Sequence, residues 1–276
     1  MNIVPKPPLK WAGGKRWLVP ELKKMWQTHQ HRRLVEPFCG GLAVTLGLQP
    51  DTALLNDINP HLINFYLHLQ QGLDATITSE EFEKDIFYAR RDRFNGYILN
   101  GQENTRESAV LFYYLNRSCF NGLCRFNRKG LFNVPIGSYK RVKYMVKEEF
   151  LAYQSVLSNW HFQTGDFEDV ELQSDDFIYA DPPYDVDFTS YAQEDFLWDD
   201  QKRLIKWLAQ HDGPVVLSNQ ATDRIIKLYK EAGYELMFLD APRRISSDGD
   251  RSPAKEVLAL RNIEKPVSDP TQMKLF

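Results

Sequence analysis

Short apolar runs alternate with helix-like segments along this 276-residue chain, and that alternation limits the folds it can adopt. The runs are rich in Val, Ile, Leu and Phe and end at turn residues, as buried strands do. They cover residues 34–38, 53–56, 160–164, 177–180, 214–218, 235–239 and 256–260. The helix-like segments cover residues 17–29, 60–70, 198–210 and 223–232. The pattern predicts an α/β fold with a mostly parallel sheet, and the loop between the last two runs predicts an antiparallel pair at one sheet end.

Charge is distributed unevenly along the chain. The 34 Lys and Arg residues and the 37 Asp and Glu residues give a net charge of −3, which excludes a uniformly basic coat. Residues 116–147 nevertheless carry eight positive and no negative side chains, and the first 33 residues carry eight Lys or Arg against Glu21 alone. Aromatic residues are interleaved in the later segment, so the two segments predict a phosphate-binding face with side chains that enter a base stack. The alternative is a solvated basic loop over core aromatics.

The sequence predicts neither a membrane span nor an export signal. The first eight residues lack the apolar run of a signal peptide, and no stretch reaches about 18 apolar residues. Cys39, Cys119 and Cys124 do not form a disulfide framework, and no zinc-ligand pattern surrounds them. We therefore expect a cytoplasmic protein without membrane association and without a bound metal.

The string Asp181-Pro182-Pro183-Tyr184 directly follows the apolar run 177–180. Ligands of open α/β sheets bind at the carboxyl ends of strands, where this string is placed. The prolines lack N–H donors but keep their carbonyl acceptors. Asp181 and the Pro182 carbonyl together suit the two hydrogens of a planar exocyclic NH2 group, and Tyr184 can stack on the attached ring. The alternative is a proline-stiffened turn with a capping Asp.

Two glycine turns point to a second ligand. Gly40 and Gly41 follow the run 34–38, and Asp57 ends the next run, a spacing typical of a ribose-binding carboxylate in a nucleoside site. The dinucleotide string G-x-G-x-x-G is absent there, which argues against NAD. The other turn carries Lys15, which suits a ligand carboxylate, although a basic loop around a core Trp11 would give the same string.

Together these motifs resemble the Dam family of DNA adenine-N6 methyltransferases, the D12 class in its α arrangement. The resemblance spans nearly the whole chain and rests on KWAGGK at 10–15, VEPF at 35–38, NDIN at 56–59, LNR at 115–117, NGLCR at 121–125, FNVP at 132–135 and DPPY at 181–184. One position departs from the family pattern, because Leu42 stands where the Phe-x-Gly-x-Gly turn has its second glycine.

The resemblance implies a Rossmann-like methyltransferase sheet that uses S-adenosyl-L-methionine, releases S-adenosyl-L-homocysteine and needs no metal. It implies a catalytic domain at 1–59 and 160–265, an inserted and mostly helical DNA-recognition domain at 60–159, and a flexible tail at 266–276. The catalytic residues would be Asp181, Pro182 and Tyr184. The cofactor would contact Trp11, Lys15, Phe38, Gly40, Asp57, Asp166, Phe167 and Asp181, with Lys15 on its carboxylate, Asp57 on its ribose and Asp166 with Phe167 against its adenine.

The resemblance also implies double-stranded DNA as the partner and GATC as the target. Relatives that read GATC contact it through residues matching Lys10, Leu123, Arg125, Pro135 and Tyr139, and Arg can read guanine bidentately. Phe120 matches an aromatic that inserts into the stack, and Arg117 and Asn121 would hold phosphates without reading sequence. Arg251-Ser252-Pro253 resembles a further phosphate-contacting loop. An enzyme of this kind would work at the nucleoid.

Some alternatives stay open at this stage. An amino methyltransferase acting on RNA or on a protein glutamine shares the fold, although the glutamine enzymes usually carry Asn in place of Asp181. A non-catalytic DNA-binding module is the other alternative. The sequence does not separate a solitary enzyme from a phage enzyme or a restriction-modification partner. The last residues, Gln272-Met273-Lys274-Leu275-Phe276, resemble peptides that bind the bacterial sliding clamp, and our hypothesis is that they do the same. The alternatives are that Leu275 and Phe276 fold back onto the catalytic domain, or that the match is a chance one.

Overall fold

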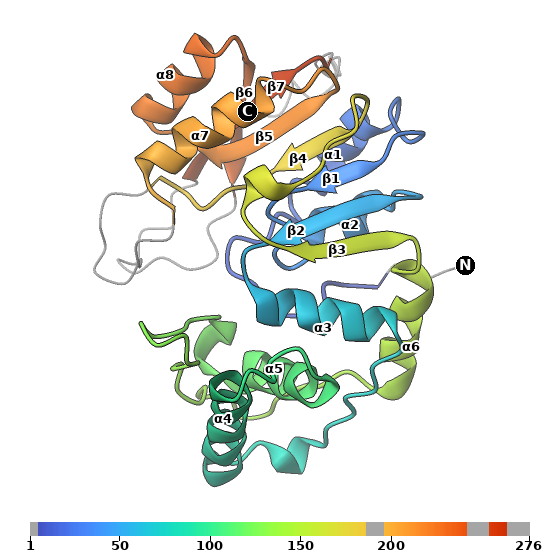
Figure 1. Ribbon diagram of the computed structural model, residues 1–276, viewed down its shortest axis with the longest axis vertical. Helices are drawn as coiled ribbons and strands as arrows, with labels where there is room; N and C mark the ends of the chain where they lie inside the picture. The colour runs from blue at the N-terminus through green and yellow to red at the C-terminus, as the bar shows by residue number, and fades with distance from the viewer. Residues whose placement is uncertain (1–4, 186–195, 242–253, 264–276) are drawn as a thin grey trace, which may run out of the picture.

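The computed structural model describes residues 5–185, 196–241 and 254–263. Within these ranges, seven strands form one sheet in the order β3-β2-β1-β4-β5-β7-β6 (Figure 1). The five strands from β3 to β5 are parallel, and β7 runs antiparallel between β5 and β6. The strands are β1 (Leu34–Glu36), β2 (Ala53–Asp57), β3 (Trp160–Thr164), β4 (Phe177–Ala180), β5 (Val215–Gln220), β6 (Glu235–Ala241) and β7 (Ala254–Arg261).

All seven predicted strands are confirmed, and so is the antiparallel pair at one end of the sheet. The two boundaries next to prolines have a simple physical cause. β1 ends at Glu36 because Pro37 has no N–H for the ladder, and β5 begins after Pro214 for the same reason. The sheet is therefore an α/β sheet of the Rossmann-like kind expected, and its carboxyl-terminal edge is where a ligand would bind.

Helices cover both faces of the sheet. The helices α1 (Val19–Trp26), α2 (Ala43–Leu48) and α3 (Pro60–Gln70) pack with one hydrophobic cluster, and α7 (Trp198–Leu208) and α8 (Asp223–Glu231) with the other. Neighbouring residues of one strand enter opposite clusters, Leu34 the first and Val35 the second. This is the pattern of a strand buried on both faces, and it explains why the strands read as continuous apolar runs.

The segment between α3 and β3 is mostly helical, as expected. It contains η1 (Ser79–Glu81), α4 (Lys84–Leu99), α5 (Arg106–Ser118), η2 (Phe120–Gly122) and α6 (Lys147–Val156). Figure 1 shows α3 between the sheet and this helical part. Tyr66 of α3 packs against Phe162 of β3, and Phe65 stacks on Tyr113 of α5, with ring centroids 5.4 and 5.8 Å apart. One core therefore continues from the sheet into the insert, and the domain boundary drawn at residue 60 stays a prediction.

Some expected features lie outside the described residues. These are Arg251-Ser252-Pro253 and the tail that includes Gln272-Met273-Lys274-Leu275-Phe276, so the phosphate contact and the clamp contact stay predictions. In the part of the chain that the structure describes, no helix is both long enough and apolar enough to cross a membrane.

The turn between β1 and α2 adopts an unusual backbone. Gly40 has φ +43°, and Leu42 has φ +58° and ψ +25°, which is the left-handed region. A residue with a Cβ pays roughly 1–2 kcal/mol there, and this explains why glycine suits the position in the Phe-x-Gly-x-Gly turn. The Leu42 side chain is fully buried in the first cluster. We conclude that burial of the Leu42 side chain offsets the backbone strain.

At Leu42, we expect the glycine variant to be more stable than the alanine variant, which is the reverse of the order found inside helices. Leu42→Ala loses the buried side chain, for about 2–5 kcal/mol, and keeps the strained backbone. Leu42→Gly loses the same contacts but relieves the strain, so it should be about 1 kcal/mol more stable than Leu42→Ala in urea unfolding. At Leu46, which is buried in the helical α2, the glycine variant should instead be the less stable by a similar amount. The same order at both positions would contradict this account.

Candidate active site

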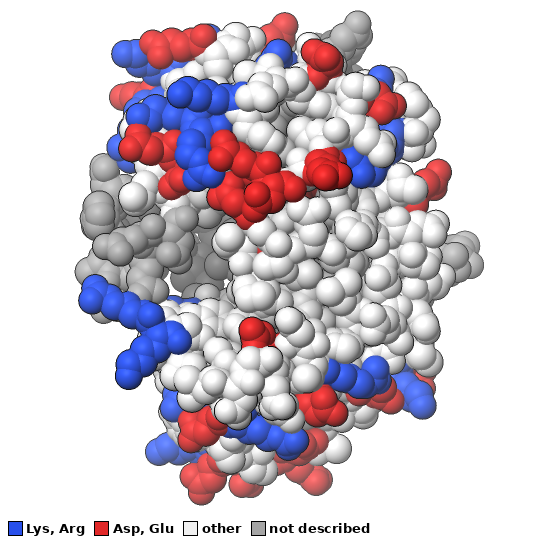
Figure 2. Space-filling model, in the orientation of Figure 1, with Lys and Arg blue, Asp and Glu red and all other residues white. Residues whose placement is uncertain are grey.

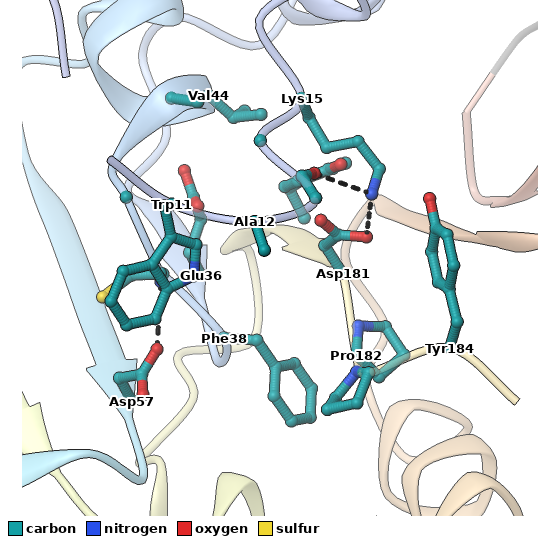
Figure 3. A pocket seen from close by; sticks show the side chains of 18 of the residues that line it. Trp11, Ala12, Lys15, Glu36, Phe38, Val44, Asp57, Asp181, Pro182 and Tyr184 are labelled. Carbon is teal, nitrogen blue, oxygen red and sulfur yellow. Dashed lines mark hydrogen bonds and ion pairs between the residues drawn. The ribbon is translucent and has the colours of Figure 1, made fainter. Parts of the chain in front are cut away.

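A cavity of about 440 Å³ opens at the carboxyl ends of β1, β2 and β4, beneath the glycine-rich N-terminal loop (Figure 3). Three acidic residues at the ends of these strands, Glu36, Asp57 and Asp181, line it together with the ammonium group of Lys15. The remaining lining residues are Trp11, Ala12, Gly13, Gly14, Phe38, Cys39, Gly40, Gly41, Ala43, Val44, Ile58, Tyr179, Pro182, Pro183 and Tyr184. The cavity is thus acidic and has aromatic walls.

Asp181 is held through one of its two carboxylate oxygens. The buried Lys15 places Nζ 2.8 Å from Asp181 Oδ1, and Figure 3 shows the two side chains pointing at each other. Ser218 of β5 donates its hydroxyl to the same Oδ1 at 2.8 Å, and its own oxygen lies 2.9 Å from the Tyr179 hydroxyl. Among the described residues, Asp181 Oδ2 has no hydrogen-bond partner. This oxygen is therefore the acceptor that the carboxylate offers to a ligand.

The charge state of Asp181 reflects two opposed effects. Burial raises the pKa of the Asp181 carboxyl, whereas the Lys15 ammonium and the Ser218 hydroxyl lower it. The ion pair thus favours a charged carboxylate in an environment that would otherwise favour the acid.

The two prolines after Asp181 differ in their surroundings. The Pro183 carbonyl accepts a 2.9 Å hydrogen bond from Nε2 of the buried Gln201, whose Oε1 accepts from Asn219. Within the described residues, the Pro182 carbonyl accepts no hydrogen bond, and Pro182 lines the cavity. Two acceptors beside one cavity, the Pro182 carbonyl and Asp181 Oδ2, are thus free of hydrogen bonds from the described residues.

The glycine turn after β1 lets Trp11 approach closely. A Cβ on Gly40 would lie 2.7 Å from Trp11 Nε1, and one on Gly41 would lie 2.8 Å from Trp11 Cβ, closer than such atoms come in real structures. The Gly40 N–H donates to Asp57 Oδ2 at 3.0 Å, and the Asn59 N–H donates to Asp57 Oδ1 at 3.0 Å. Burial raises the pKa of Asp57, and these two donors oppose the shift. Each Asp57 oxygen keeps a lone pair for a further donor.

The structure brings together most of the predicted cofactor residues. Trp11, Lys15, Phe38, Gly40, Asp57 and Asp181 all line the cavity. Asp166 and Phe167 do not line it. Phe167 is buried with its ring 5.6 Å from that of Phe38, and Asp166 pairs with Arg203 at 2.9 Å. Contact of these two residues with a ligand stays a prediction.

Lys10 connects the glycine-rich N-terminal loop above the cavity to the predicted DNA-binding segment. Its backbone N–H donates to Asn116 Oδ1 at 2.9 Å, and its carbonyl accepts from Asn116 Nδ2 at 2.8 Å. Its ammonium donates to the Arg117 carbonyl at 2.8 Å and lies 3.8 Å from the centre of the Tyr139 ring. Burial and the charge of Arg117 lower the pKa of Lys10. The two basic segments of the chain therefore meet at Lys10.

The remaining predicted DNA contacts lie in and after η2. Phe120 and Leu123 expose 45% and 36% of their surface, which is unusual for large apolar side chains. The Phe120 N–H donates to the Pro135 carbonyl, and Arg125 Nε donates to Asn133 Oδ1 at 2.8 Å. The backbone of Asn121 adopts the left-handed conformation, with φ +53°. Figure 2 shows basic side chains projecting from the left of the lower half of the molecule, beside the loops that follow α5 in Figure 1.

The sequence interpretation missed several residues of the site. Ser218, Gln201 and Glu256 surround Asp181 and Tyr184 from β5, α7 and β7, and Glu36 lines the cavity from β1. A signal was present only for Glu36, a charged residue between Val35 and Pro37 in a strand that is otherwise apolar. Ser218 and Glu256 adjoin the polar residues Asn219 and Lys255, so the sequence does not single them out. In the described part of the chain, no group of three or more His, Cys, Asp or Glu side chains is arranged to hold a metal ion.

Glu36 should make stability fall with rising pH. Burial raises the pKa of Glu36 to about 8, Asp181 adds to the shift, and the Thr45 hydroxyl opposes it. Above pH 4.5 the unfolded chain loses a proton that the folded protein keeps until about pH 8, so the free energy of unfolding falls by up to about 1.4 kcal/mol per unit in this window. Glu36→Gln removes this dependence. Its stability relative to the native sequence should therefore rise between pH 5 and pH 8 in urea unfolding.

The exposed Glu231 on α8 provides the control, since Glu231→Gln should show a flat difference over the same pH range. A difference for Glu36→Gln that stays constant or falls with pH would contradict a protonated Glu36.

Comparisons with a family model and with individual relatives agree on one family. The family model of the D12 class N6 adenine-specific DNA methyltransferases matches residues 11–244. A DNA adenine methylase from Vibrio cholerae is 37% identical over 270 residues, covering 91% of this chain and 94% of that protein. The retron Ec67 DNA adenine methylase from Escherichia coli is 34% identical, covering 91% and 90%. The type II methyltransferase M.MjaIII from Methanocaldococcus jannaschii is 34% identical, covering 89% and 94%. The chain belongs to the D12 class of N6 adenine-specific DNA methyltransferases.

Proposed function

We propose that the protein transfers a methyl group from S-adenosyl-L-methionine to N6 of an adenine in double-stranded DNA. The observation that carries this proposal is the pair of free acceptors, Asp181 Oδ2 and the Pro182 carbonyl, beside an acidic cavity. Two acceptors match the two hydrogens of an exocyclic amino group. Family membership and the names of the relatives support adenine in DNA as the substrate.

The cavity fits the proposed cofactor. Its volume of about 440 Å³ lies in the range of small-molecule sites. The cofactor carries a sulfonium, an ammonium and a carboxylate, so it is cationic overall. The cavity is lined by the carboxylates of Asp57 and Asp181 and by the ammonium of Lys15, so negative charge exceeds positive charge there. Asp57 would accept the ribose hydroxyls with its remaining lone pairs, and Trp11 and Phe38 would supply aromatic walls. Asp166 and Phe167 would lie against the adenine, and the Phe167 ring already packs on that of Phe38, which lines the cavity.

The target base must leave the DNA stack to reach Asp181. Flipping an adenine costs roughly a few kcal/mol, and stacking of the freed base on Tyr184 would offset part of this. S-adenosyl-L-methionine supplies an electrophilic methyl group when it is bound. Asp181 Oδ2 and the Pro182 carbonyl would each accept a hydrogen of the target NH2. Delocalisation of the nitrogen lone pair into the ring is then reduced, and the nitrogen becomes a better nucleophile. As N6 takes the methyl group, the sulfur–methyl bond would break, the sulfur would keep the electron pair in S-adenosyl-L-homocysteine, and N6 would release one proton to water. Fixed positioning contributes the rest.

The insert, together with Lys10 of the N-terminal loop, would supply the sequence recognition. Arg125 and Lys10 would read base edges together with Leu123, Pro135 and Tyr139, and the exposed Phe120 would enter the stack. Arg117 and Asn121 would hold phosphates. Their matching positions in relatives that read GATC support GATC as the target. The enzyme would then act in the cytoplasm on nucleoid DNA.

Replacement of Asp181 should abolish transfer while the fold survives. Asp181→Ala removes one of the two acceptors and the charge beside the cavity, so turnover should fall by at least about 10²-fold. The measurement is incorporation of labelled methyl groups into a duplex with many adenines, followed by identification of N6-methyladenine. Asp175→Ala, which changes an exposed carboxylate, should retain full activity.

Circular dichroism of each variant establishes that it is folded before the assay. The proposed activity is wrong if the native protein leaves no N6-methyladenine in any adenine-containing duplex. The role of Asp181 is wrong if Asp181→Ala turns over within a few-fold of the native protein.

Expression in a host without adenine methylation tests the target. We expect N6-methyladenine at GATC sites when the genome is mapped at single-base resolution. Arg125→Ala should relax this preference, because loss of a bidentate contact to guanine removes about 1–3 kcal/mol of discrimination. Methylation at sites without GATC would refute the target but not the enzyme class.

A further inference from the structure

Glu256 is a buried carboxylate next to the site, and neither the cavity lining nor the sequence motifs include it. It lies on β7 between two strands, opposite Gln220 of β5 and Leu239 of β6, so its backbone is fixed on both sides. Only 4% of its surface is exposed. Burial of a carboxylate is unfavourable unless partners compensate, so its contacts should account for its presence.

The side-chain contacts of Glu256 within the described residues are with Tyr184 and Lys15, both of which line the cavity. Glu256 Oε1 accepts the hydroxyl of Tyr184 and lies 3.8 Å from Lys15 Nζ. Lys15 therefore lies between two carboxylates, those of Asp181 and Glu256. Glu256 Oε2 is buried and has no partner within the described residues. Burial raises the pKa of Glu256, and Lys15 and Tyr184 oppose that shift.

The hydroxyl contact restrains Tyr184 at both ends. The side chain begins at the backbone of the Asp181-Pro182-Pro183-Tyr184 turn and ends at Glu256, so the direction of its Cβ–Oη axis is set. Lys15 Nζ lies 4.7 Å from the ring centre, which adds a cation–π contact. A tyrosine without the Glu256 contact could take other staggered rotamers and point away from the cavity.

We infer that Glu256 is a positioning residue that fixes Tyr184 for stacking of the target base. The inference rests on the proposed function, because the stacked base is the adenine of that reaction. Glu256 does not touch the reacting atoms. It acts through the Tyr184 hydroxyl, and it steadies Lys15 on the Oδ1 side of Asp181.

A double-mutant cycle tests the coupling between Glu256 and Tyr184. Glu256→Ala should lower kcat about 10- to 100-fold, with KM for duplex and cofactor within about threefold, because positioning is lost and binding is not. Tyr184→Phe should lower kcat in the native background but by less than twofold in the Glu256→Ala background. Glu256→Gln keeps an acceptor for the hydroxyl and should recover a large part of the loss. An equal effect of Tyr184→Phe in both backgrounds would overturn the inference.

A measurement without catalysis separates this inference from the proposed function. The probe is 3-fluorotyrosine at position 184, read by fluorine NMR on the free protein. Glu256→Ala should move the fluorine resonance, Glu256→Gln should move it less, and the exposed control Glu231→Ala should leave it in place. An unmoved resonance in Glu256→Ala would overturn the inference. Moved resonances in a protein that methylates no adenine would retain the contact and reject only the proposed function.

Discussion

The ion pair between the buried Lys15 and the partly buried Asp181 connects two parts of the chain that are remote in sequence. It fastens the glycine-rich N-terminal loop to the carboxyl end of β4. Such a pair gains strength from its low-dielectric surroundings, but desolvation opposes it, and only good geometry makes it favourable. The Ser218 hydroxyl improves that geometry by donating to the same oxygen. As a result, Asp181 Oδ1 is bonded to Lys15 and Ser218, and Asp181 Oδ2 has no hydrogen-bond partner in the described part of the chain.

The same loop carries the connection to the insert. Trp11 lies against Gly40 and Gly41, and Lys10 is bonded to Asn116 and Arg117. A Cβ at Gly122 would lie 2.3 Å from Lys10 Cβ, so the insert fits closely around this residue. The cavity and the insert therefore contact the same short N-terminal loop, so a ligand that orders the loop in the cavity should also affect its contacts with the insert.

Much of this was readable from the sequence, and the exceptions have physical causes. The strands could be predicted because both faces of the sheet are buried, which makes each strand a continuous apolar run. The turn at Asp181 could be predicted because two prolines directly follow the end of such a run. The partners of Asp181 and Tyr184 could not, because Ser218 and Glu256 depend on the register of β5 and β7. The turn at Leu42 was also unreadable, since a left-handed leucine is stable only where its side chain finds a core.

The most direct test of the account is a crystal structure of the protein with S-adenosyl-L-homocysteine and a duplex that contains the target site. The account predicts an extrahelical adenine whose N6 lies within hydrogen-bond distance of Asp181 Oδ2 and the Pro182 carbonyl. Oδ1 should remain bonded to Lys15 and Ser218. An adenine that stays stacked in the duplex, or an N6 bonded to neither acceptor, would contradict the central claim.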